Sequence, residues 1–293
     1  METLEALKSR SESTEGLGSV VSTMKSLSAV HIRQYESAVR ALRRYDRTLE
    51  LGLRALLQAH RAAAPDLSDR KEPRRTALIL FGSDYGLCGQ FNDELVEYAL
   101  DLVDRLGLGA DDRLLASIGA RASASLHARD RPPQVELDAP SSVGGIANAG
   151  RALLIAIDRW RMHDGVERVL LIRHRHESAS HLRVEHEQLV PIELSRFRRS
   201  VEQPWPSRRI PTFTMNAEQL LSALLRELLA VSVFRAFGES GASEHASRLQ
   251  AMQAAERNVD EKLQELRADF HRRRQDAITS ELLDIVSGYE ALG

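Results

Sequence analysis

Residues 76–92 read TALILFGSDYGLCGQFN, an apolar run followed at once by a glycine-rich stretch. The run at 76–81 predicts a buried strand, because it is short, apolar and bounded by turn residues. The glycine-rich stretch predicts a tight turn into a helix, which we expect Asn92 or Asp93 to cap. A strand that ends in glycines also raises the question of a phosphate-binding loop.

The spacing of the glycines argues against nucleotide binding. A P-loop needs a lysine and a hydroxyl after its last glycine, because these groups meet the phosphates and magnesium. Here Gln90 and Phe91 stand where the lysine and the hydroxyl residue would be. A dinucleotide fingerprint needs the spacing Gly-x-Gly-x-x-Gly, whereas Gly82, Gly86 and Gly89 are four and three apart. We therefore expect no cofactor at this turn.

The middle of the chain alternates between strand and helix patterns. Further strands are expected at 113–119, 168–173 and 187–194, and helices at 93–106 and 146–163. This alternation favours an α/β fold, with a mostly parallel sheet that carries helices on its faces. Residues 195–211 are rich in proline and read as a connector.

All nine prolines lie between Pro65 and Pro211, and none occurs in the 64 residues before or the 82 after. Proline costs about 3 kcal/mol inside a helix, so its absence permits very long helices. We therefore divide the chain into an N-terminal coiled-coil helix (1–64), a central α/β domain (65–212) and a C-terminal coiled-coil helix (213–293). At about 1.5 Å per residue, 70 helical residues extend beyond any compact domain.

Apolar periodicity supports the two terminal helices. Steps of four and three residues from Leu17 to Leu56 meet mainly large apolar or aromatic side chains, including Tyr45. The C-terminal segment opens with Asn216 and Gln219, a capping box. It continues with a seam at Leu249, Met252, Val259, Leu263, Leu266, Phe270 and Ala277, and then on a shifted face at Ile278, Leu282, Ile285 and Tyr289.

The two terminal segments also carry opposite charge. Residues 1–64 hold ten basic and seven acidic side chains, and residues 212–293 hold nine and thirteen. We expect the helices to pair antiparallel. The net charge of −2 gives no basic field for nucleic acid. One cysteine, no apolar run near the roughly 20 residues of a membrane span, and an acidic first stretch favour a cytoplasmic location.

The remaining reactive side chains have simple structural explanations. Cys88 has no base beside it in the sequence, so we interpret it as a small buried thiol. Four histidines fall in HRHESASHLRVEHE (174–187), namely His174, His176, His181 and His186. Their spacing matches no standard metal-ligand pattern, and a histidine-bearing hairpin explains them more simply than a metal site. His31 and His245 lie on helix faces, where packing is the simpler role.

Three stretches together resemble the gamma subunit of F-type ATP synthases. TMKSLSAVHIR (23–33) is similar to the family's N-terminal helix, and GSDYGLCGQFN (82–92) is similar to its signature SDRGLCGGFN. GESGASEHASRLQAM (238–252) and RRRQDAITSELLDIVSGYEAL (272–292) resemble its C-terminal block almost position for position. The resemblance covers nearly the whole chain, weakly between 93 and 235. It implies an antiparallel coiled coil joined to a Rossmann-like domain.

The resemblance also implies which residues matter. The glycine-rich turn becomes part of the rotor's globular foot, through Gly82, Ser83, Asp84, Gly86, Leu87, Cys88, Gly89, Phe91 and Asn92. Contacts to the beta subunit are implied for Met24, Lys25, Arg274 and Gln275. An axle tip in an apolar bearing is implied for Ile285, Val286, Tyr289 and Leu292.

The function implied is that of a central-stalk rotor. It would couple proton or sodium flow through the membrane c-ring to ATP synthesis or hydrolysis in a ring of alpha and beta subunits, with an epsilon subunit as a further partner. It would catalyse nothing itself, hold no cofactor or metal, bind no nucleic acid, and lie at the cytoplasmic face of the bacterial cell membrane without inserting.

Two departures from the family pattern suggest a divergent branch, of the kind found in alternate bacterial ATPases. Tyr85 stands where the family usually has arginine, and TEGLGSVV (14–21) lacks the usual basic, threonine-rich stretch. Two other readings stay open on the residues alone. One is a nucleotide-binding α/β enzyme with a coiled-coil dimerisation arm, and the other is a structural coiled-coil adaptor.

Overall fold

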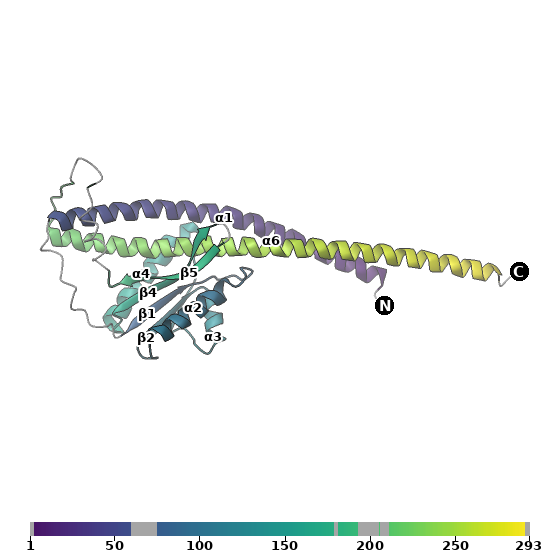
Figure 1. Cartoon of the computed structure of the whole chain (residues 1–293), viewed down its shortest axis with the longest axis horizontal. Coiled ribbons are helices and arrows are strands. Elements are labelled where there is room, and N and C mark those ends of the chain that lie inside the picture. The colour runs from purple at the N-terminus through teal and green to yellow at the C-terminus, as the bar shows by residue number, and fades with distance from the viewer. Residues whose placement is uncertain (1–2, 60–74, 179–180, 193–204, 206–210, 291–293) are drawn as a thin grey trace. The chain divides into compact units, whose positions relative to one another are not determined.

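The computed structural model describes residues 3–59, 75–178, 181–192, 205 and 211–290 (Figure 1). The expected connector at 195–211 and the last residues of the strand expected at 187–194 lie almost wholly outside this part. The chain divides into two compact units. The first comprises the described residues up to Ala29 and from Arg248 onward, and the second runs from Val30 to Ser247. Helices α1 (Leu4–Ala59) and α6 (Ala217–Glu290) each contribute a stretch to both units.

The second unit contains a five-stranded sheet in the order β3-β2-β1-β4-β5. Its strands are β1 (Thr76–Phe81), β2 (Arg113–Ile118), β3 (Val135–Leu137), β4 (Arg168–Ser178) and β5 (His181–Val190). The first four run parallel and β5 runs antiparallel to β4, which confirms the α/β fold class. β5 begins earlier than expected and ends before Pro191. The sequence analysis missed β3, which has only three residues.

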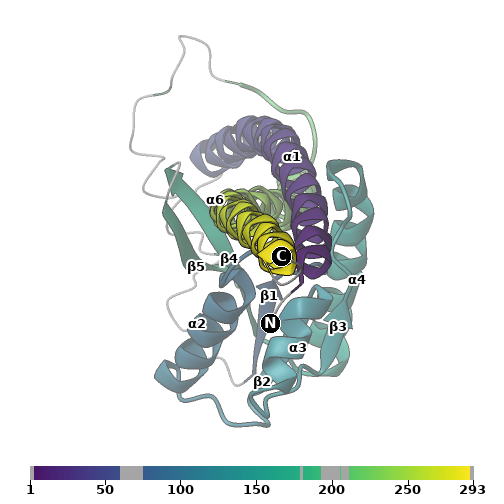
Figure 2. The same cartoon turned by 90° about the vertical axis from the view of Figure 1, so that its right-hand side faces the viewer.

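Helices cover both faces of this sheet (Figure 2). One face packs against α2 (Phe91–Arg105) and α3 (Ala120–His127), through Leu78 and Leu80 of β1. The other face packs against α4 (Ile146–His163), which follows the short turn η2 (Val143–Gly145), and against stretches of α1 and α6. α4 has the expected bounds. The sequence analysis missed α3, whose sequence ARASASLH carries no apolar stripe.

In the first unit, α1 and α6 pair antiparallel. Lys25 lies opposite Glu256, Gly18 opposite Val259, and Glu15 opposite Arg267. The expectation that Leu17 belongs to the seam is wrong, because its side chain is 61% exposed. Its neighbour Gly18 faces α6 instead. The next predicted positions, Val21, Met24 and Ser28, are half-buried or buried, so the error lies at the first position of this run.

The seam on α6 also ends earlier than the periodicity predicts. Leu266 is buried and Phe270 is half-buried, but every described side chain from Arg274 to Ser287 is exposed. The continuation through Ile278, Leu282 and Ile285 is therefore not packed against any described residue. α1 begins only at Leu4, so the last turns of α6 have no counterpart on it in the described residues.

In the second unit, the same two helices pack on each other and on the sheet. Leu49, Leu53 and Leu57 of α1 form a cluster with Leu228 and Val231 of α6. The expected seam position Tyr45 is 46% exposed, so that assignment is wrong. At the start of α6, the backbone N–H groups of Glu218 and Gln219 donate to Asn216 Oδ1 at 2.9 and 3.4 Å, which confirms that Asn216 caps the helix.

Candidate functional site

A buried amide closes the turn after β1. The backbone N–H of Ser83 donates to Asn92 Oδ1 at 3.0 Å, and Asn92 Nδ2 donates to Ser83 Oγ at 2.9 Å. The expectation that Asn92 or Asp93 caps α2 is wrong, because Gln90 occupies that position without a side-chain cap. Asn92 lies one residue inside the helix, where its amide closes the turn instead.

Asp93 also has a different role from the one expected. Its carboxylate accepts a hydrogen bond from Ser125 Oγ at 2.7 Å and pairs with Arg129 at 3.2 Å, so it ties α2 to α3. The hydrogen bond from Ser125, helped by Arg129, lowers the pKa of Asp93 although burial acts in the opposite direction.

Two glycines let the loops after β1 and β2 approach closely. A Cβ on Gly82 would lie 2.4 Å from Ala122 Cβ. Gly119 has φ +96°, and a Cβ there would lie 2.6 Å from the carbonyl carbon of Ser83. Asp84 Oδ1 accepts a hydrogen bond from the backbone N–H of Ala120, at the start of α3, at 3.1 Å. It accepts a second one from the backbone N–H of Ala139 at 3.4 Å. An internal carboxylate therefore occupies the helix end that a phosphate would use.

Cys88 is buried, as expected. Asn92 Nδ2 donates to its sulfur at 3.5 Å, and Ser83 Oγ lies 3.7 Å from it. The outer side of the same turn is exposed: Tyr85 is 73% exposed and Leu87 59%, the latter with φ +61°.

Three serines of α6 dock this helix on the sheet, and the sequence analysis missed them. Ser240 Oγ donates to Phe81 O at 2.8 Å, and Ser243 Oγ to His174 O at 3.3 Å. Ser247 Oγ donates to Cys88 O at 2.6 Å. The signal is their spacing of three and four residues among glycines and alanines, which places them on one helix face. They connect α6 directly to β1, β4 and the turn.

An ion-pair network that is buried at its centre and exposed at Arg43 joins four elements of the second unit. Its members are Arg43 and Asp46 of α1, Arg173 of β4, Glu185 and Glu187 of β5, and Arg235 and Glu239 of α6. At its centre, Arg173 is 3% exposed and lies 2.8 Å from both Glu239 and Glu187. A second contact of Glu239, to Arg43, is also 2.8 Å long.

The opposite charges in this network keep one another ionised. Burial alone would lower the pKa of Arg173, but Glu187, Glu239 and Glu185 raise it above its ordinary value. Burial alone would raise the pKa of Glu239, but Arg173 and Arg43 lower it below its ordinary value. Both groups therefore stay charged, and removing Arg173 would leave Glu239 buried with Arg43 as its remaining partner.

The residues implied as beta-subunit contacts all belong to the first unit. Met24 is half-buried, and Lys25 Nζ pairs with Glu256 at 2.6 Å. Arg274 and Gln275 are exposed, while Arg273 is half-buried. The structure does not bring the two pairs together, because Lys25 lies opposite Glu256. At the expected tip, Ile285 is 69% and Val286 52% exposed. The side chain of Tyr289 and the whole of Leu292 lie outside the described residues.

The histidines pack rather than converge. His174 is buried, its ring stacks on Phe91 at 4.2 Å between centroids, and its Nε2 lies 2.7 Å from Phe91 O. Burial lowers the pKa of His174 to about 4, against the effect of that backbone contact. His186 meets the Tyr98 hydroxyl at 2.8 Å. The strand pair β4–β5 confirms the expected hairpin. The side chains of His176 and His181 lie outside the described residues.

His31 and His245 stack on each other at 4.6 Å, which confirms their role in packing. Within the described residues, no group of three or more histidine, cysteine or acidic side chains is placed to hold a metal ion. In the same part of the chain, no helix combines the length and the apolar character needed to cross a bilayer.

Two terminal helices pair antiparallel, and serines and ion pairs fix them to the α/β domain in the second unit; the chain is thus an α/β protein with an antiparallel pair of terminal helices. The family model described as ATP synthase matches residues 3–292. The chain therefore belongs to the ATP synthase family.

Similar proteins carry a more particular name. The chain is 29% identical to the ATP synthase gamma chain of Bacteroides fragilis, over 98% of this chain and 99% of the relative. It is 28% identical to the ATP synthase gamma chain of Geotalea daltonii, over 100% and 99%. A solved structure of the rotor of the Euglena gracilis mitochondrial ATP synthase has the same fold, with a TM-score of 0.63 and 14% identity over 94% of this chain and 98% of that one.

Proposed function

We infer that the chain is the central-stalk gamma subunit of a rotary F-type ATP synthase. The observation that carries this inference is the end-to-end match of residues 3–292 to the family, with relatives named as gamma chains aligned over almost their full length. Neither the enzyme nor the adaptor alternative accounts for a match of this extent.

In this role the chain catalyses nothing by itself. It turns within a ring of alpha and beta subunits, and its foot binds the epsilon subunit and the membrane c-ring. The turn after β1 supports a non-catalytic foot, because Asp84 already occupies the N-terminus of α3 and no lysine stands in the loop. The complex lies at the cytoplasmic face of a bacterial cell membrane, with this chain peripheral to the bilayer.

Rotation requires that force applied to the foot reaches the helices. The serine contacts and the Arg173 network provide such a link in the second unit, since they join β1, β4 and β5 to both helices. Short hydrogen bonds and buried ion pairs resist sliding better than apolar contacts, which are not directional. The stretches of α1 and α6 that belong to the second unit therefore move together with the sheet.

The surface that transmits force to the ring is the exposed part of the first unit. We assign Arg274 and Gln275 to a contact with a beta-subunit loop, and Met24 and Lys25, which lie opposite Glu256, to a separate contact with the beta subunits. Exposed Ile285 and Val286 suit an apolar bearing, because no described side chain covers them. Tyr289 and Leu292 belong to the same tip by position.

The test is a double variant in the purified complex. We expect Arg274→Ala with Gln275→Ala to lower the ATPase rate about tenfold at unchanged subunit stoichiometry, because a partly desolvated charge-assisted hydrogen bond contributes about 1.5–3 kcal/mol. The matched control is Arg267→Ala, whose partner Glu15 is on α1 of the same chain. Equal rates for the double variant and the parent would remove both residues from force transmission. ATP turnover by the chain without partners would favour the enzyme alternative.

A further inference from the structure

The outer face of α4 carries exposed side chains in a line, Arg151, Ile155, Arg159 and Met162, which are called the α4 stripe below. Their spacing of four, four and three residues places them on one side of the helix, over about 16 Å of its axis. Ile155 is 72% and Met162 81% exposed. Single exposed apolar residues are common on protein surfaces, so the meaning of these two depends on their neighbours.

The two arginines of the stripe have no carboxylate partner among the described residues. Arg151 Nη2 donates to the amide oxygen of Asn148 at 2.6 Å, and Arg159 makes no hydrogen bond or ion pair within the same part of the chain. Asp158 borders the stripe, but neither arginine pairs with it. A guanidinium has five N–H donors, and a carboxylate is the acceptor that it binds most strongly in proteins, through two parallel hydrogen bonds.

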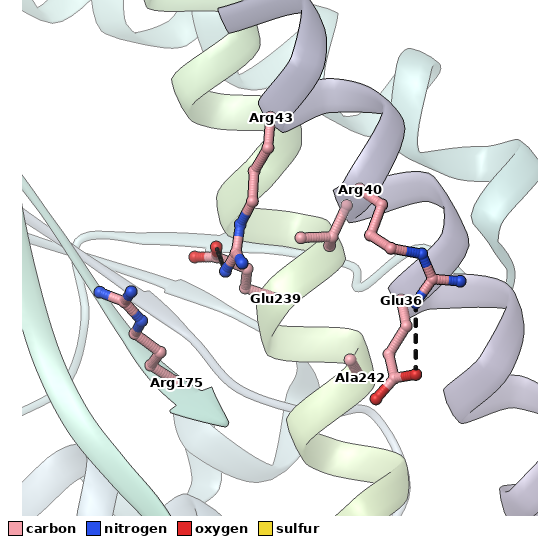
Figure 3. A pocket seen from close by; sticks show the side chains of 7 residues that line it. Glu36, Arg40, Arg43, Arg175, Glu239 and Ala242 are labelled. Atoms are coloured by element: carbon pink, nitrogen blue, oxygen red, sulfur yellow. Dashed lines mark hydrogen bonds and ion pairs between the residues drawn. The ribbon is translucent and has the colours of Figure 1, made fainter. Parts of the chain in front are cut away.

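Other arginines of the second unit are already neutralised. A cavity of about 300 Å³ lies between α1, α6 and β4, and each of its arginines pairs with a glutamate of the same chain: Arg40 with Glu36, Arg43 with Glu239, and Arg175 with Glu185. Figure 3 shows Arg40 and Arg175 on opposite sides of α6, turned away from each other. That cavity therefore selects no acidic ligand, whereas the α4 stripe carries positive charge without a counterpart.

The inner side of α4 is fixed to α6. Leu153, Ile157 and Trp160 are buried in the core, and a Cβ added to Gly150 would lie 2.3 Å from the ring of Phe234 on α6. Such close packing leaves little room for α4 to shift against α6. A partner bound to the stripe is therefore connected to α6 through a tightly packed contact.

The charges of the stripe select its occupant. A second copy placed with Ile155 against Ile155 would bring Arg151 against Arg159 in an antiparallel pair, and like charges repel. A bilayer favours a helix with a wide apolar face, whereas this face has only two large apolar side chains, set between cations. A polypeptide with carboxylates at the spacing of the arginines would neutralise both of them and cover the apolar side chains as well.

We propose that the α4 stripe binds an amphipathic segment of another polypeptide, which sets carboxylates against Arg151 and Arg159 and apolar side chains against Ile155 and Met162. The two arginines are about 12 Å apart along the helix axis. The partner's carboxylates should therefore lie about seven or eight residues apart on a helix, or about four apart on a strand. The proposal rests on the inferred function, because the partner is taken to be another subunit of the same complex.

Photo-crosslinking of the purified complex tests the proposal. Benzoylphenylalanine in place of Ile155 or Met162 should bond to another subunit on illumination, and mass spectrometry locates the bond. We expect the bonded segment to carry two carboxylates at the spacing given above. The control is the same probe in place of Glu97, an exposed residue of α2 on the other face of the sheet. This probe should give no product at that segment, and an equal yield from it would overturn the proposal.

Charge reversal isolates the contribution of the arginines. We expect Arg151→Glu with Arg159→Glu to lower the yield from the Met162 probe at least about tenfold, because two charge-assisted contacts are replaced by repulsion. The matched control is Arg161→Glu, an exposed position on another side of α4, which should leave the yield unchanged. An unchanged yield in the double variant would overturn the proposal.

The possible outcomes separate the stripe from the inferred function. No bond from either probe, or bonds only within the chain or to a second copy, in a complex that hydrolyses ATP normally would overturn the stripe proposal alone. A charge-dependent bond to another polypeptide in an assembly without alpha and beta subunits would support the stripe and contradict the function. Binding of the isolated chain to phosphatidylglycerol vesicles, lost in the double variant, would assign the stripe to lipid and overturn the proposal.

Discussion

α1 and α6 pair in both units, but the two pairings use different chemistry. In the second unit they bury leucines at Leu49, Leu53 and Leu228 and share a network of buried charges. In the first unit few side chains are buried, among them Leu7 and Leu266; the ion pair Arg267–Glu15 is exposed and Lys25–Glu256 is half-buried. The same two helices thus form a fixed contact in one unit and a largely exposed pair in the other.

The difference corresponds to two tasks. Buried charge pairs fix geometry, and losing one partner is costly because the other stays buried. Surface pairs contribute about 0–1 kcal/mol, so they leave the helices stable without binding their side chains tightly. In the proposed function, the second unit holds the helices on the foot and the first presents apolar and basic side chains to partners. The following variants break or sharpen that contrast.

The largest effect is expected from Arg173→Met. The change leaves buried Glu239 with only Arg43 and half-buried Glu187 with only Arg235, and we expect it to lower the free energy of unfolding by about 3 kcal/mol. Urea unfolding of the isolated chain measures it. The matched control in the first unit is Arg267→Met, which loses an exposed pair with Glu15 and should cost at most about 1 kcal/mol. Similar decreases in the free energy of unfolding for both variants would show that the ion pairs of the two units contribute equally to stability.

A pH-dependent loss of stability is expected from His174. Its pKa is lowered from 6.5 to about 4 by burial, so between these values the unfolded chain binds a proton that the folded chain does not. Stability is therefore lost as the pH falls from 6.5 towards 4, by about 3 kcal/mol in full at 1.36 kcal/mol per pKa unit.

The check on this expectation is His174→Gln, which keeps an N–H donor for Phe91 O but does not titrate. Unfolding free energies of the parent and the variant, measured at several pH values from 7 to 4.5, should converge as the pH falls. Two parallel curves would show that another group controls the acid response. No described histidine of the first unit is buried in this way, so the effect belongs to the second unit.

The sequence predicts those helices and strands whose own residues show a clear apolar pattern. β1 and α4 have the expected bounds because an apolar run or stripe and its flanking residues define each of them. The sequence does not predict β3, because three residues are too few to show a hydrophobic periodicity. It does not predict α3, because a run of small residues shows none either. Asn92 has a typical capping side chain, yet it closes the turn to Ser83, a choice that only the folded loop makes.

The contacts between distant segments are the part that periodicity misses. Arg173 and Glu239 are 66 residues apart, and nothing in either segment identifies the other as its partner. The charge difference between the terminal segments predicts that the helices attract each other, but not which side chains meet. Ser240, Ser243 and Ser247 could be found from their spacing, although the spacing names no acceptor.

The smallest effect, and the sharpest comparison, comes from one substitution made in each unit. Gly16 is in α1 of the first unit, where an added Cβ meets nothing within 4 Å. Alanine is about 1 kcal/mol more favourable than glycine inside a helix, so Gly16→Ala should stabilise the chain by up to that amount. Gly241 is in α6 of the second unit, where an added Cβ would lie 2.5 Å from Cε1 and 2.8 Å from Cζ of Tyr35.

Tyr35 cannot easily move away from that methyl group. Its ring is 3% exposed and tilts against His245, and its hydroxyl reaches Pro140 O at 3.4 Å. Overpacking costs about 1–3 kcal/mol, which exceeds the helical gain, so Gly241→Ala should destabilise the chain by about 1–2 kcal/mol. Thermal unfolding of both variants beside the parent gives the comparison. Because the covalent change is identical, opposite signs isolate packing from helix propensity. Stabilisation by both substitutions would mean that α1 and α6 yield as easily on the foot as they do in the exposed pair.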